Sequence, residues 1–378
     1  MLFNRNFWFA LFVFIGTTVG AGIFGLPYIA AKSGIAPVIF YFFILGGAMV
    51  LIHLFFGEVL LRTKEDYRLV GLTRKYLGRK SSVLVSFSVI IGLGGSLLVY
   101  IILGGDFLSI LLSNIFPLSP FYGTLIFWLI FSPLILKGIK LIAPVEILTN
   151  SLFFIIIIAI FIFGAPKISF DNFEMINFSN SLLPYGVILF SLAGMSALPE
   201  IKTLLKTGEE KKSLKKVITS SFLIIIPFCL LFSFLVFGIS GKSTSEDVFG
   251  GLAAFLGPQI IFLGALASFI TISDSFLIIA LYLRNTCVCD YKLSPTISNF
   301  LVIGVPMILF LAGFRQFVEV IGFLGSIIGA VEGVIIILLY MKSKTLGNRK
   351  PEYSINVPKI VPYFLMALFI FGAIFQLF

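Results

Sequence analysis

Apolar runs of about 20 residues recur from one end of this chain to the other, and they limit the possible folds more than any other feature. A helix of that length spans the roughly 30 Å of hydrocarbon in a bilayer. Only helices and closed barrels satisfy their backbone hydrogen bonds in lipid, and barrel strands would appear as short alternating segments instead of continuous runs. The sequence therefore predicts an all-α integral membrane protein.

The runs predict eleven transmembrane helices in one domain. Their expected spans are residues 6–31, 36–61, 82–113, 119–137, 140–165, 181–203, 216–240, 257–284, 294–313, 315–341 and 359–378. Composition agrees, because 59% of the 378 residues are hydrophobic and 12% are charged, against about 25% charged in an average soluble domain. The first run lacks a small-residue cleavage site, so we interpret it as a structural helix and not as a removable signal.

The positive charges predict the orientation of the chain. Lys and Arg are retained in cytoplasmic connections, and with the amino terminus inside the cell all but four of the 27 fall on that side. The four on the outside are Lys32, Lys167, Lys242 and Arg315. We expect a multi-pass protein of the plasma membrane, surrounded by lipid bilayer, with its carboxyl terminus outside. The same rule accounts for the net charge of +10, which therefore indicates no nucleic-acid partner.

The three cysteines, Cys229, Cys287 and Cys289, are too few for a disulfide framework. Cys287 and Cys289 also lack the further Cys or His ligands that a zinc site needs. We expect reduced thiols, no metal site and no cofactor.

Helix-weakening residues interrupt the first run. Residues 16–27 hold four glycines and Pro27; a glycine inside a helix costs about 1 kcal/mol relative to alanine, and proline removes a backbone hydrogen bond. The sixth run repeats this register, since the Ala-Gly pair at 21–22 and the Leu-Pro pair at 26–27 recur at 193–194 and 198–199, 172 residues later. We predict that both helices break at these motifs.

The two motifs predict an internal repeat. Five helices separate them, so one break is entered from the cytoplasm and the other from outside, which is inverted-topology symmetry. We expect one repeat over about residues 6–165, a second over about 181–341 and an extra helix over about 359–378. Matched interrupted helices indicate a midplane substrate site, because unwound backbone offers N–H groups to an anion and carbonyl groups to a cation. The alternative is that the glycines only allow helices to pack closely.

The residues around these motifs resemble a known family. Residues 16–28 resemble the first-helix signature of the amino acid/auxin permeases and the hydroxy/aromatic amino acid permeases, members of the amino acid-polyamine-organocation superfamily. Tyr100 with residues 104–106, and residues 190–200, are similar to the third- and sixth-helix patterns of those permeases. Residues 265–270 resemble the Ala/Ser/Phe run of the hydroxy/aromatic branch.

The resemblance implies a LeuT-type fold, five plus five inverted helices with one extra, which moves its substrate by alternating access with a coupled H⁺ or Na⁺. It implies that the first and sixth helices clasp an amino acid and that the first and eighth hold a cation. The substrate-binding residues implied by position are Thr17, Thr18, Gly20, Ala21, Gly22, Ile23, Tyr100, Ser191, Ala193, Gly194 and Met195. The cation candidates on these two helices are Gly16, Ser268 and Thr271.

Six acidic residues of the predicted helices are candidates for intramembrane charges, each of which costs about 2.5–3.5 kcal/mol on insertion scales. They are Glu58, Asp106, Glu146, Glu200, Asp274 and Glu332. Glu58 and Glu200 lie near cytoplasmic ends, where we expect salt-bridged gate positions. Desolvation favours a protonated carboxyl group, so the deeper Asp274 and Glu332 are candidates for carrying a coupled proton. Structural hydrogen bonding is the alternative for both.

H⁺ is favoured over Na⁺ because the eighth helix offers few hydroxyl ligands: Ser268, Thr271, Ser273 and Ser275. His53, the single histidine, has no evident acidic or thiol companion. We expect it to be hydrogen-bonded and packed inside the helices.

These features predict a secondary active amino acid transporter. The apolar residues around the breaks, such as Phe24 and Leu192, favour a neutral substrate that is large or aromatic. An enzyme would need a nucleophile and base in reach of one another, which the chain lacks. A transporter of another solute or of a metal ion on the same fold, and a non-transporting nutrient sensor, stay open as alternatives. The identity of the substrate, the direction of transport and the oligomeric state also stay open.

Overall fold

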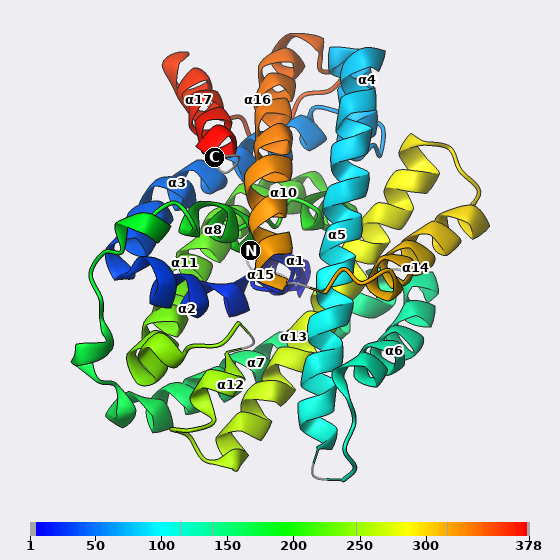
Figure 1. Cartoon of the computed structure of the whole chain (residues 1–378). Coiled ribbons are helices and arrows are strands. Elements are labelled where there is room, and N and C mark those ends of the chain that lie inside the picture. Colours follow the sequence, from blue (N-terminus) through cyan, green and yellow to red (C-terminus); the bar gives the residue numbers. More distant parts are fainter. Residues whose placement is uncertain (1–4, 114, 138, 247, 316, 376–378) are drawn as a thin grey trace.

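The computed structural model describes residues 5–113, 115–137, 139–246, 248–315 and 317–375, and the side chains of residues 137–150 lie outside this description. Every regular element within these ranges is a helix. The prediction of an all-α protein is therefore confirmed (Figure 1).

The helices vary widely in length. The α-helices are α1 (Arg5–Thr18), α2 (Gly22–Ser33), α3 (Ile35–Leu61), α4 (Leu69–Leu77), α5 (Arg79–Leu112), α6 (Pro120–Phe131), α7 (Ile139–Gly164), α8 (Pro184–Ser191), α9 (Ala197–Leu204), α10 (Gly208–Lys212), α11 (Leu214–Ser240), α12 (Phe249–Leu252), α13 (Pro258–Asn285), α14 (Pro295–Leu311), α15 (Phe317–Phe323), α16 (Gly329–Leu346) and α17 (Ile360–Phe375). The 3₁₀ helices are η1 (Ser132–Lys137), η2 (Ala165–Lys167), η3 (Phe170–Asn172), η4 (Phe178–Asn180) and η5 (Gly241–Ser243). Two π-helices are η6 (Thr286–Asp290) and η7 (Leu324–Ile328).

Many of these helices are long and apolar enough to cross a membrane. Within the described residues, five continuous helical stretches meet that test: Ile35–Leu61, Arg79–Leu112, Gly208–Ser243, Pro258–Asp290 and Phe317–Leu346. The pair α1 and α2 meets it as one broken span, and four shorter apolar stretches are Pro120–Leu136, Ser151–Lys167, Pro295–Leu311 and Ile360–Phe375. The protein is therefore a multi-pass membrane protein, while the count of eleven crossings stays a prediction.

Both predicted helix breaks are present. The first helix ends at Thr18 and resumes at Gly22 with a bend of 44°. In the sixth predicted span, α8 ends at Ser191 and α9 begins at Ala197. The breaks fall on the Ala-Gly pairs that recur in the sequence, so the local weakness of these residues as helix formers decides where each helix opens.

The broken helices occupy the centre of the molecule. α1 packs against α7, α9, α11 and α13, and α2 packs against α8 and α11. α5 runs along α13 and α6 and stands beside α16 at the front of the view (Figure 1). Long unbroken helices thus enclose two interrupted ones, while the division into two repeats stays a prediction.

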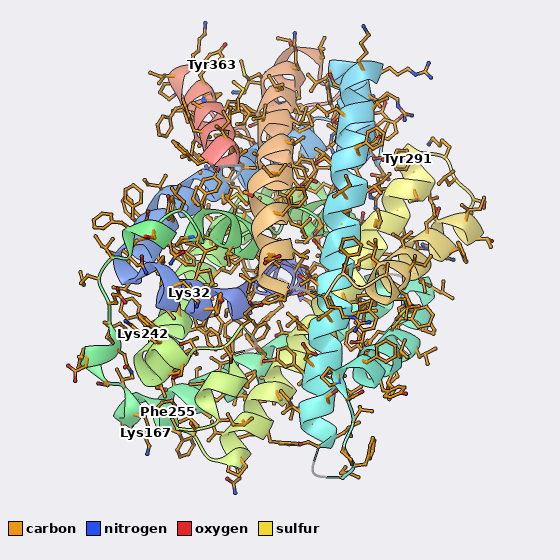
Figure 2. The ribbon with its side chains drawn as sticks, in the orientation of Figure 1. Lys32, Lys167, Lys242, Phe255, Tyr291 and Tyr363 are labelled. Carbon is orange, nitrogen blue, oxygen red and sulfur yellow. The ribbon has the colours of Figure 1, made fainter. Side chains whose placement is uncertain are left out.

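The charge-rich and charge-poor connections lie apart. α4 and the connection between α16 and α17, both rich in Lys and Arg, lie at the top of Figure 1. Lys167 and Lys242, two of the four charges predicted outside, lie in the lower half of Figure 2. The separation agrees with the charge pattern of the sequence, and which end faces the cytoplasm stays a prediction.

Candidate substrate and cation site

The first break interrupts the helical hydrogen bonds between Val19 and Phe24. The N–H of Val19 makes the last helical bond of α1, with an N–O distance of 2.8 Å, and the N–H of Phe24 makes the next one, at 3.3 Å. The buried N–H groups of Gly20, Gly22 and Ile23 have no hydrogen-bond acceptor within the described part of the chain. Free N–H groups at a helix start carry partial positive charge and attract anions. This stretch can therefore bind a carboxylate.

Tyr100 of α5 contacts the one other N–H group of the first break, which belongs to Ala21. Its hydroxyl group interacts with the N–H of Ala21 and with the hydroxyl of Ser275 on α13. Gly20 lies against the same two side chains: a methyl group added there would overlap the Tyr100 hydroxyl and come within 2.6 Å of Ser275 Oγ. Glycine at position 20 is thus what lets α5 and α13 approach the break.

A side chain from α3 holds the second break, residues 192–196. The Nε2 atom of His53 lies 3.1 Å from the backbone nitrogen of Gly194, and its Nδ1 atom lies 2.7 Å from the carbonyl oxygen of Met49. These contacts confirm the hydrogen-bonded, packed role predicted for His53. Its contact with the second break is a feature that the sequence did not indicate.

The two breaks contact one another. A methyl group added to Gly22 would overlap the backbone of Ser191, and one added to Gly194 would overlap the hydroxyl of Thr18. The glycines therefore do serve close packing, as the alternative interpretation held. The same packing places the two unwound stretches side by side, so they form one site.

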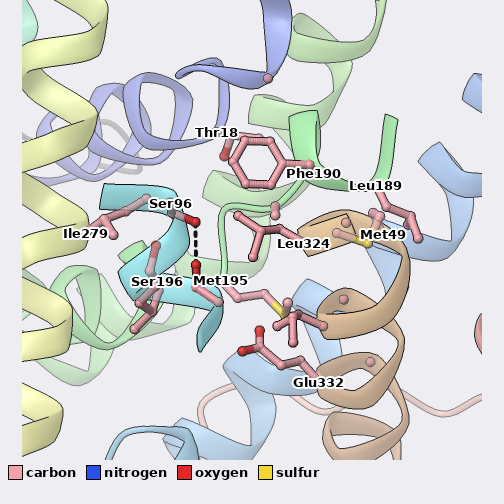
Figure 3. Close-up of a pocket in the computed structure, with 18 of the residues that line it drawn as sticks. Thr18, Met49, Ser96, Leu189, Phe190, Met195, Ser196, Ile279, Leu324 and Glu332 are labelled. Carbon is pink, nitrogen blue, oxygen red and sulfur yellow. Dashed lines mark hydrogen bonds between the residues drawn. The ribbon is translucent and has the colours of Figure 1, made fainter. Parts of the chain in front are cut away.

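A pocket opens beside both breaks (Figure 3). Of the predicted site residues, it is lined by Thr17, Thr18, Gly22, Tyr100, Ala193, Met195 and Glu332. Thr18 and Phe190 lie at one end of the view, and Glu332 lies at the other end beside Met195. The predicted residues Gly20, Ala21 and Gly194 lie in the breaks, and Ile23 and Ser191 lie in the helical turns beside them, but none of the five lines the pocket.

The rest of the pocket wall comes from α8, the second break and the helices around the broken pair, and none of its residues was among the predicted site residues. These residues are Met49, Ile52, Gly92, Leu93, Ser96, Leu189, Phe190, Ser196, Ile279, Leu324, Gly325, Ile328, Gly329, Gly333 and Phe369. Most are apolar, with Ser96 and Ser196 as the exceptions, and Glu332 supplies the one carboxyl group among the described residues of the wall.

The hydroxyl groups beside the breaks are already engaged. Thr17 and Thr18 donate to carbonyl oxygens four residues earlier in α1, at 2.8 and 2.7 Å. Ser191 donates to a carbonyl oxygen three residues earlier in α8, at 2.9 Å. Because these protons are used within their own helices, the free donors of the site are the backbone N–H groups. Contact of the two threonines with a carboxylate stays a prediction.

α13 meets the first break through a polar contact. The hydroxyl of Ser275 donates to the carbonyl oxygen of Gly16 at 2.9 Å. The preceding residue, Asp274, is 5% exposed, and one turn earlier the buried Thr271 hydroxyl has no hydrogen-bond partner in the described residues. Ser268 lies seven residues from Ser275, about 10 Å along the helix, and its hydroxyl bonds to its own helix. The structure thus brings Gly16 and α13 together at Ser275 and not at Ser268.

Comparison with known proteins adds to this geometry. The model of the tryptophan/tyrosine permease family matches residues 4–376. The chain belongs to this family. A search of the curated proteins gives no significant match. Among solved structures, the permease is similar to the crystal structure of MhsT in complex with L-phenylalanine, at 15% identity and a TM-score of 0.66, over 98% of this chain and 96% of that one.

At 15% identity the similarity to MhsT shows the fold, which is the LeuT-type fold that the resemblance implied. Membership of a tryptophan/tyrosine permease family also confirms the resemblance to amino acid permeases. The protein is an amino acid permease of the membrane, and the two breaks lie at its centre.

A buried charge cluster lies at the end of the permease that holds α4 and the connection between α16 and α17. Because both are rich in Lys and Arg, we call it the basic end. Arg68 and Glu200 form an ion pair with an N–O distance of 2.6 Å, and Asn285 donates to Glu200 at 3.1 Å. Asp290 accepts from the N–H groups of Arg68 and Gly71, at 3.1 and 2.8 Å. The cluster therefore ties the segment before α4 to α9 and to the end of α13. The predicted salt-bridged state of Glu200 is confirmed.

Glu58 has a separate set of partners at the same end. Its carboxylate pairs with Arg62 at 2.7 Å and accepts from Ser354 and from the N–H of Ile355. Glu58 thus links α3 to the segment before α17, and its predicted salt bridge is confirmed. The side chain of Glu146 lies outside the described residues.

Proposed function

We propose that this permease carries aromatic and other large neutral amino acids across the cell membrane by alternating access. The observation that carries the proposal is the pocket beside the two breaks. Gly22 lines the pocket and offers it a free backbone N–H for a carboxylate, the free N–H groups of Gly20 and Ile23 lie next to it in the chain, and the wall is otherwise mostly apolar. A zwitterionic amino acid with an apolar side chain fits both the free N–H and the apolar wall.

The wall of the pocket favours a large side chain. Met49 and Met195 contribute flexible, polarisable sulfur-containing chains that adapt to aromatic rings. Phe190 adds an aromatic partner at the end near Thr18 (Figure 3). The family description names tryptophan and tyrosine, and MhsT was crystallised with L-phenylalanine; both support the same class of substrate here.

H⁺ is the driving ion in this proposal, with Asp274 or Glu332 as its carrier. Asp274 adjoins Ser275, which donates to Gly16 in the last turn of α1, so a change of charge at Asp274 acts next to the first break. Glu332 faces the pocket, where it gains and loses water as the pocket opens and closes. The permease requires no cofactor beyond this cation.

The basic end faces the cytoplasm in this proposal, with the amino terminus inside and the carboxyl terminus outside. The Arg68–Glu200 pair then closes the cytoplasmic side in the present conformation. Opening that side requires α9 to leave the segment before α4, which breaks the pair.

The decisive experiment uses the purified permease in liposomes. Labelled tryptophan, tyrosine, phenylalanine, leucine and alanine are offered under an inward H⁺ gradient, an inward Na⁺ gradient or neither. We expect accumulation of the aromatic amino acids under the H⁺ gradient alone. Saturable uptake of none of the five by folded protein would overturn the proposed function, and accumulation under Na⁺ alone would overturn the choice of ion.

Two substitutions separate coupling from binding. D274N and E332Q each remove one titrating group, and E319Q makes the same kind of change at an exposed residue outside the pocket. We expect the residue that carries the proton to lose H⁺-driven accumulation while exchange of internal for external substrate continues. If both variants accumulate substrate as E319Q does, neither residue carries the proton.

A further inference from the structure

His53 occupies a position where both of its ring nitrogens are committed. The ring is fully buried and lies edge-on to Phe14 and Phe222, with centroid distances of 5.4 and 5.0 Å. A carbonyl oxygen only accepts, so the Nδ1 atom facing Met49 carries the proton. A backbone N–H only donates, so the Nε2 atom facing Gly194 is the acceptor. The contacts therefore assign a neutral ring with its proton on Nδ1.

The N–H that His53 accepts belongs to the unwound stretch of the second break. Gly194 lies between the helical ends of α8 and α9, so no helical carbonyl is in place for its N–H. On its other side, Gly194 packs directly against the Thr18 hydroxyl of the first break. The residues on either side of it, Ala193 and Met195, line the pocket. A shift of Gly194 would therefore move two pocket residues and disturb the contact between the breaks.

We infer that His53 is a positioning residue of the transport site. Through Nε2 it holds Gly194 against the first break, and so it sets the placement of Ala193 and Met195 around the substrate. The inference rests on the proposed function, in which the pocket beside the breaks binds the amino acid. His53 itself does not line the pocket; it acts through Gly194.

An imidazole suits this role because it joins two backbone groups on different elements. One nitrogen is anchored to Met49 in its own helix, and Met49 and Ile52 of the same helix line the pocket. The other nitrogen reaches across to the second break. α3 thus supplies part of the pocket wall through Met49 and Ile52, and through the ring of His53 it also holds Gly194, whose neighbours Ala193 and Met195 line the pocket.

The test compares three substitutions in the full-length permease. H53L removes the acceptor of the Gly194 N–H. H53N has a side-chain oxygen, but its side chain is too short to reach that N–H, whereas H53Q keeps a carbonyl oxygen near the position of Nε2. F222L serves as the control for packing, since Phe222 contacts the ring without bonding to Gly194. KM and maximal rate of substrate exchange are measured in liposomes, together with amide hydrogen exchange over residues 192–196.

An unpaired, buried N–H at Gly194 disfavours the observed position of this residue. The equilibrium between the observed and the displaced position shifts by about 5- to 150-fold. We expect KM to rise within that range in H53L and H53N, with H53Q recovering most of the affinity and F222L close to wild type. Amide exchange of residues 192–196 should accelerate in H53L and H53N but not in H53Q. Rescue by H53Q is the result that a merely structural role would not produce.

Unchanged KM and unchanged amide exchange in a folded H53L or H53N variant would overturn the inference. If H53L does not fold, the comparison of H53N with H53Q decides. Amide exchange needs no substrate, so it also separates the two proposals. Should the wild type transport no amino acid, the proposed function fails, while the amide exchange still shows whether His53 holds Gly194.

Discussion

Substitution of Glu200 by Gln should open the basic end of the permease. The carboxylate is 2% exposed and its partner Arg68 is 7% exposed, so E200Q leaves a buried guanidinium without its ion-pair partner. Removing one member of a buried pair costs about 3–5 kcal/mol. The proposed opening moves α9 away from the segment before α4 and exposes both side chains to water, so we expect the loss to fall on the closed state alone. At the lower value of about 3 kcal/mol, the ratio of closed to open protein falls by about 150-fold.

Labelling of a single cysteine measures this shift. Ser196 lines the pocket at the start of α9, and Ser196→Cys in a background without Cys229, Cys287 and Cys289 reports access to the pocket. In vesicles that expose the basic end, a membrane-impermeant maleimide should label this cysteine much faster in E200Q. The rate rises with the fraction of open protein and levels off once most of the protein is open. Because both charges are absent from the double variant R68Q/E200Q, its labelling rate should return towards wild type.

E58Q is the matched control for this experiment. It makes the same change at a buried, Arg-paired carboxylate at the same end of the molecule. Glu58 has no bond to α9 or α13 among the described residues, so its loss should lower stability without opening the pocket. Equal labelling rates for wild type and a folded E200Q would refute the role of the ion pair as a closing contact.

Three further outcomes follow from close contacts in the structure. G22A should abolish substrate exchange, because the added methyl overlaps the backbone of Ser191 and overpacking costs about 1–3 kcal/mol; G94A, which meets nothing within 4 Å, should exchange normally in the same assay. S275A should lower the free energy of unfolding by about 0.5–1.5 kcal/mol, because the hydrogen bond to Gly16 is lost. S273A should lower it less, because the Ser273 hydroxyl bonds only to its own helix. Equal shifts of the melting temperature in the two variants would contradict this. G186A should reduce the yield of folded protein in size-exclusion chromatography, because the added methyl overlaps the carbonyl of Gly322 in α15, while G304A in an open position should not.

The breaks could be predicted from the sequence because their cause is local. Glycine and proline weaken a helix wherever they stand, so residues 16–27 and 190–200 indicated the interruptions without knowledge of any neighbour. The π-helix η7 inside the predicted span 315–341 could not be predicted in this way. It lies where Gly325 packs onto the backbone of Gly186 in α8, and a contact between such distant segments leaves no local signal in the sequence.

The residues of the pocket wall could not be predicted from the sequence, for a related reason. α3 is apolar on nearly every face, so no periodicity marks the side that carries Met49 and Ile52. In lipid, both the buried and the outer faces of a helix are apolar, and hydrophobic pattern loses its power to distinguish them. The contact of His53 with Gly194 depends in the same way on how α3 packs against the second break. Ser275, by contrast, was among the predicted hydroxyl candidates, and only the structure selected it over Ser268.

The kinds of contact around the breaks indicate which surfaces separate during transport. Gly22 against Ser191 and Gly194 against Thr18 are close contacts without space for a methyl group, so the two broken helices should move together. Their links to α5 and α13 run through two side chains: the N–H of Ala21 faces the Tyr100 hydroxyl, the Ser275 hydroxyl donates to Gly16, and Gly20 lies against both. Each hydrogen bond of this kind contributes only about 0.5–1.5 kcal/mol net, and side-chain ends can move where backbone cannot. We therefore expect the moving boundary to lie between the broken pair and α5 with α13. Asp274 adjoins that boundary on α13, where a bound proton can favour one state over the other, because a ligand shifts an equilibrium only through its difference in affinity for the two states.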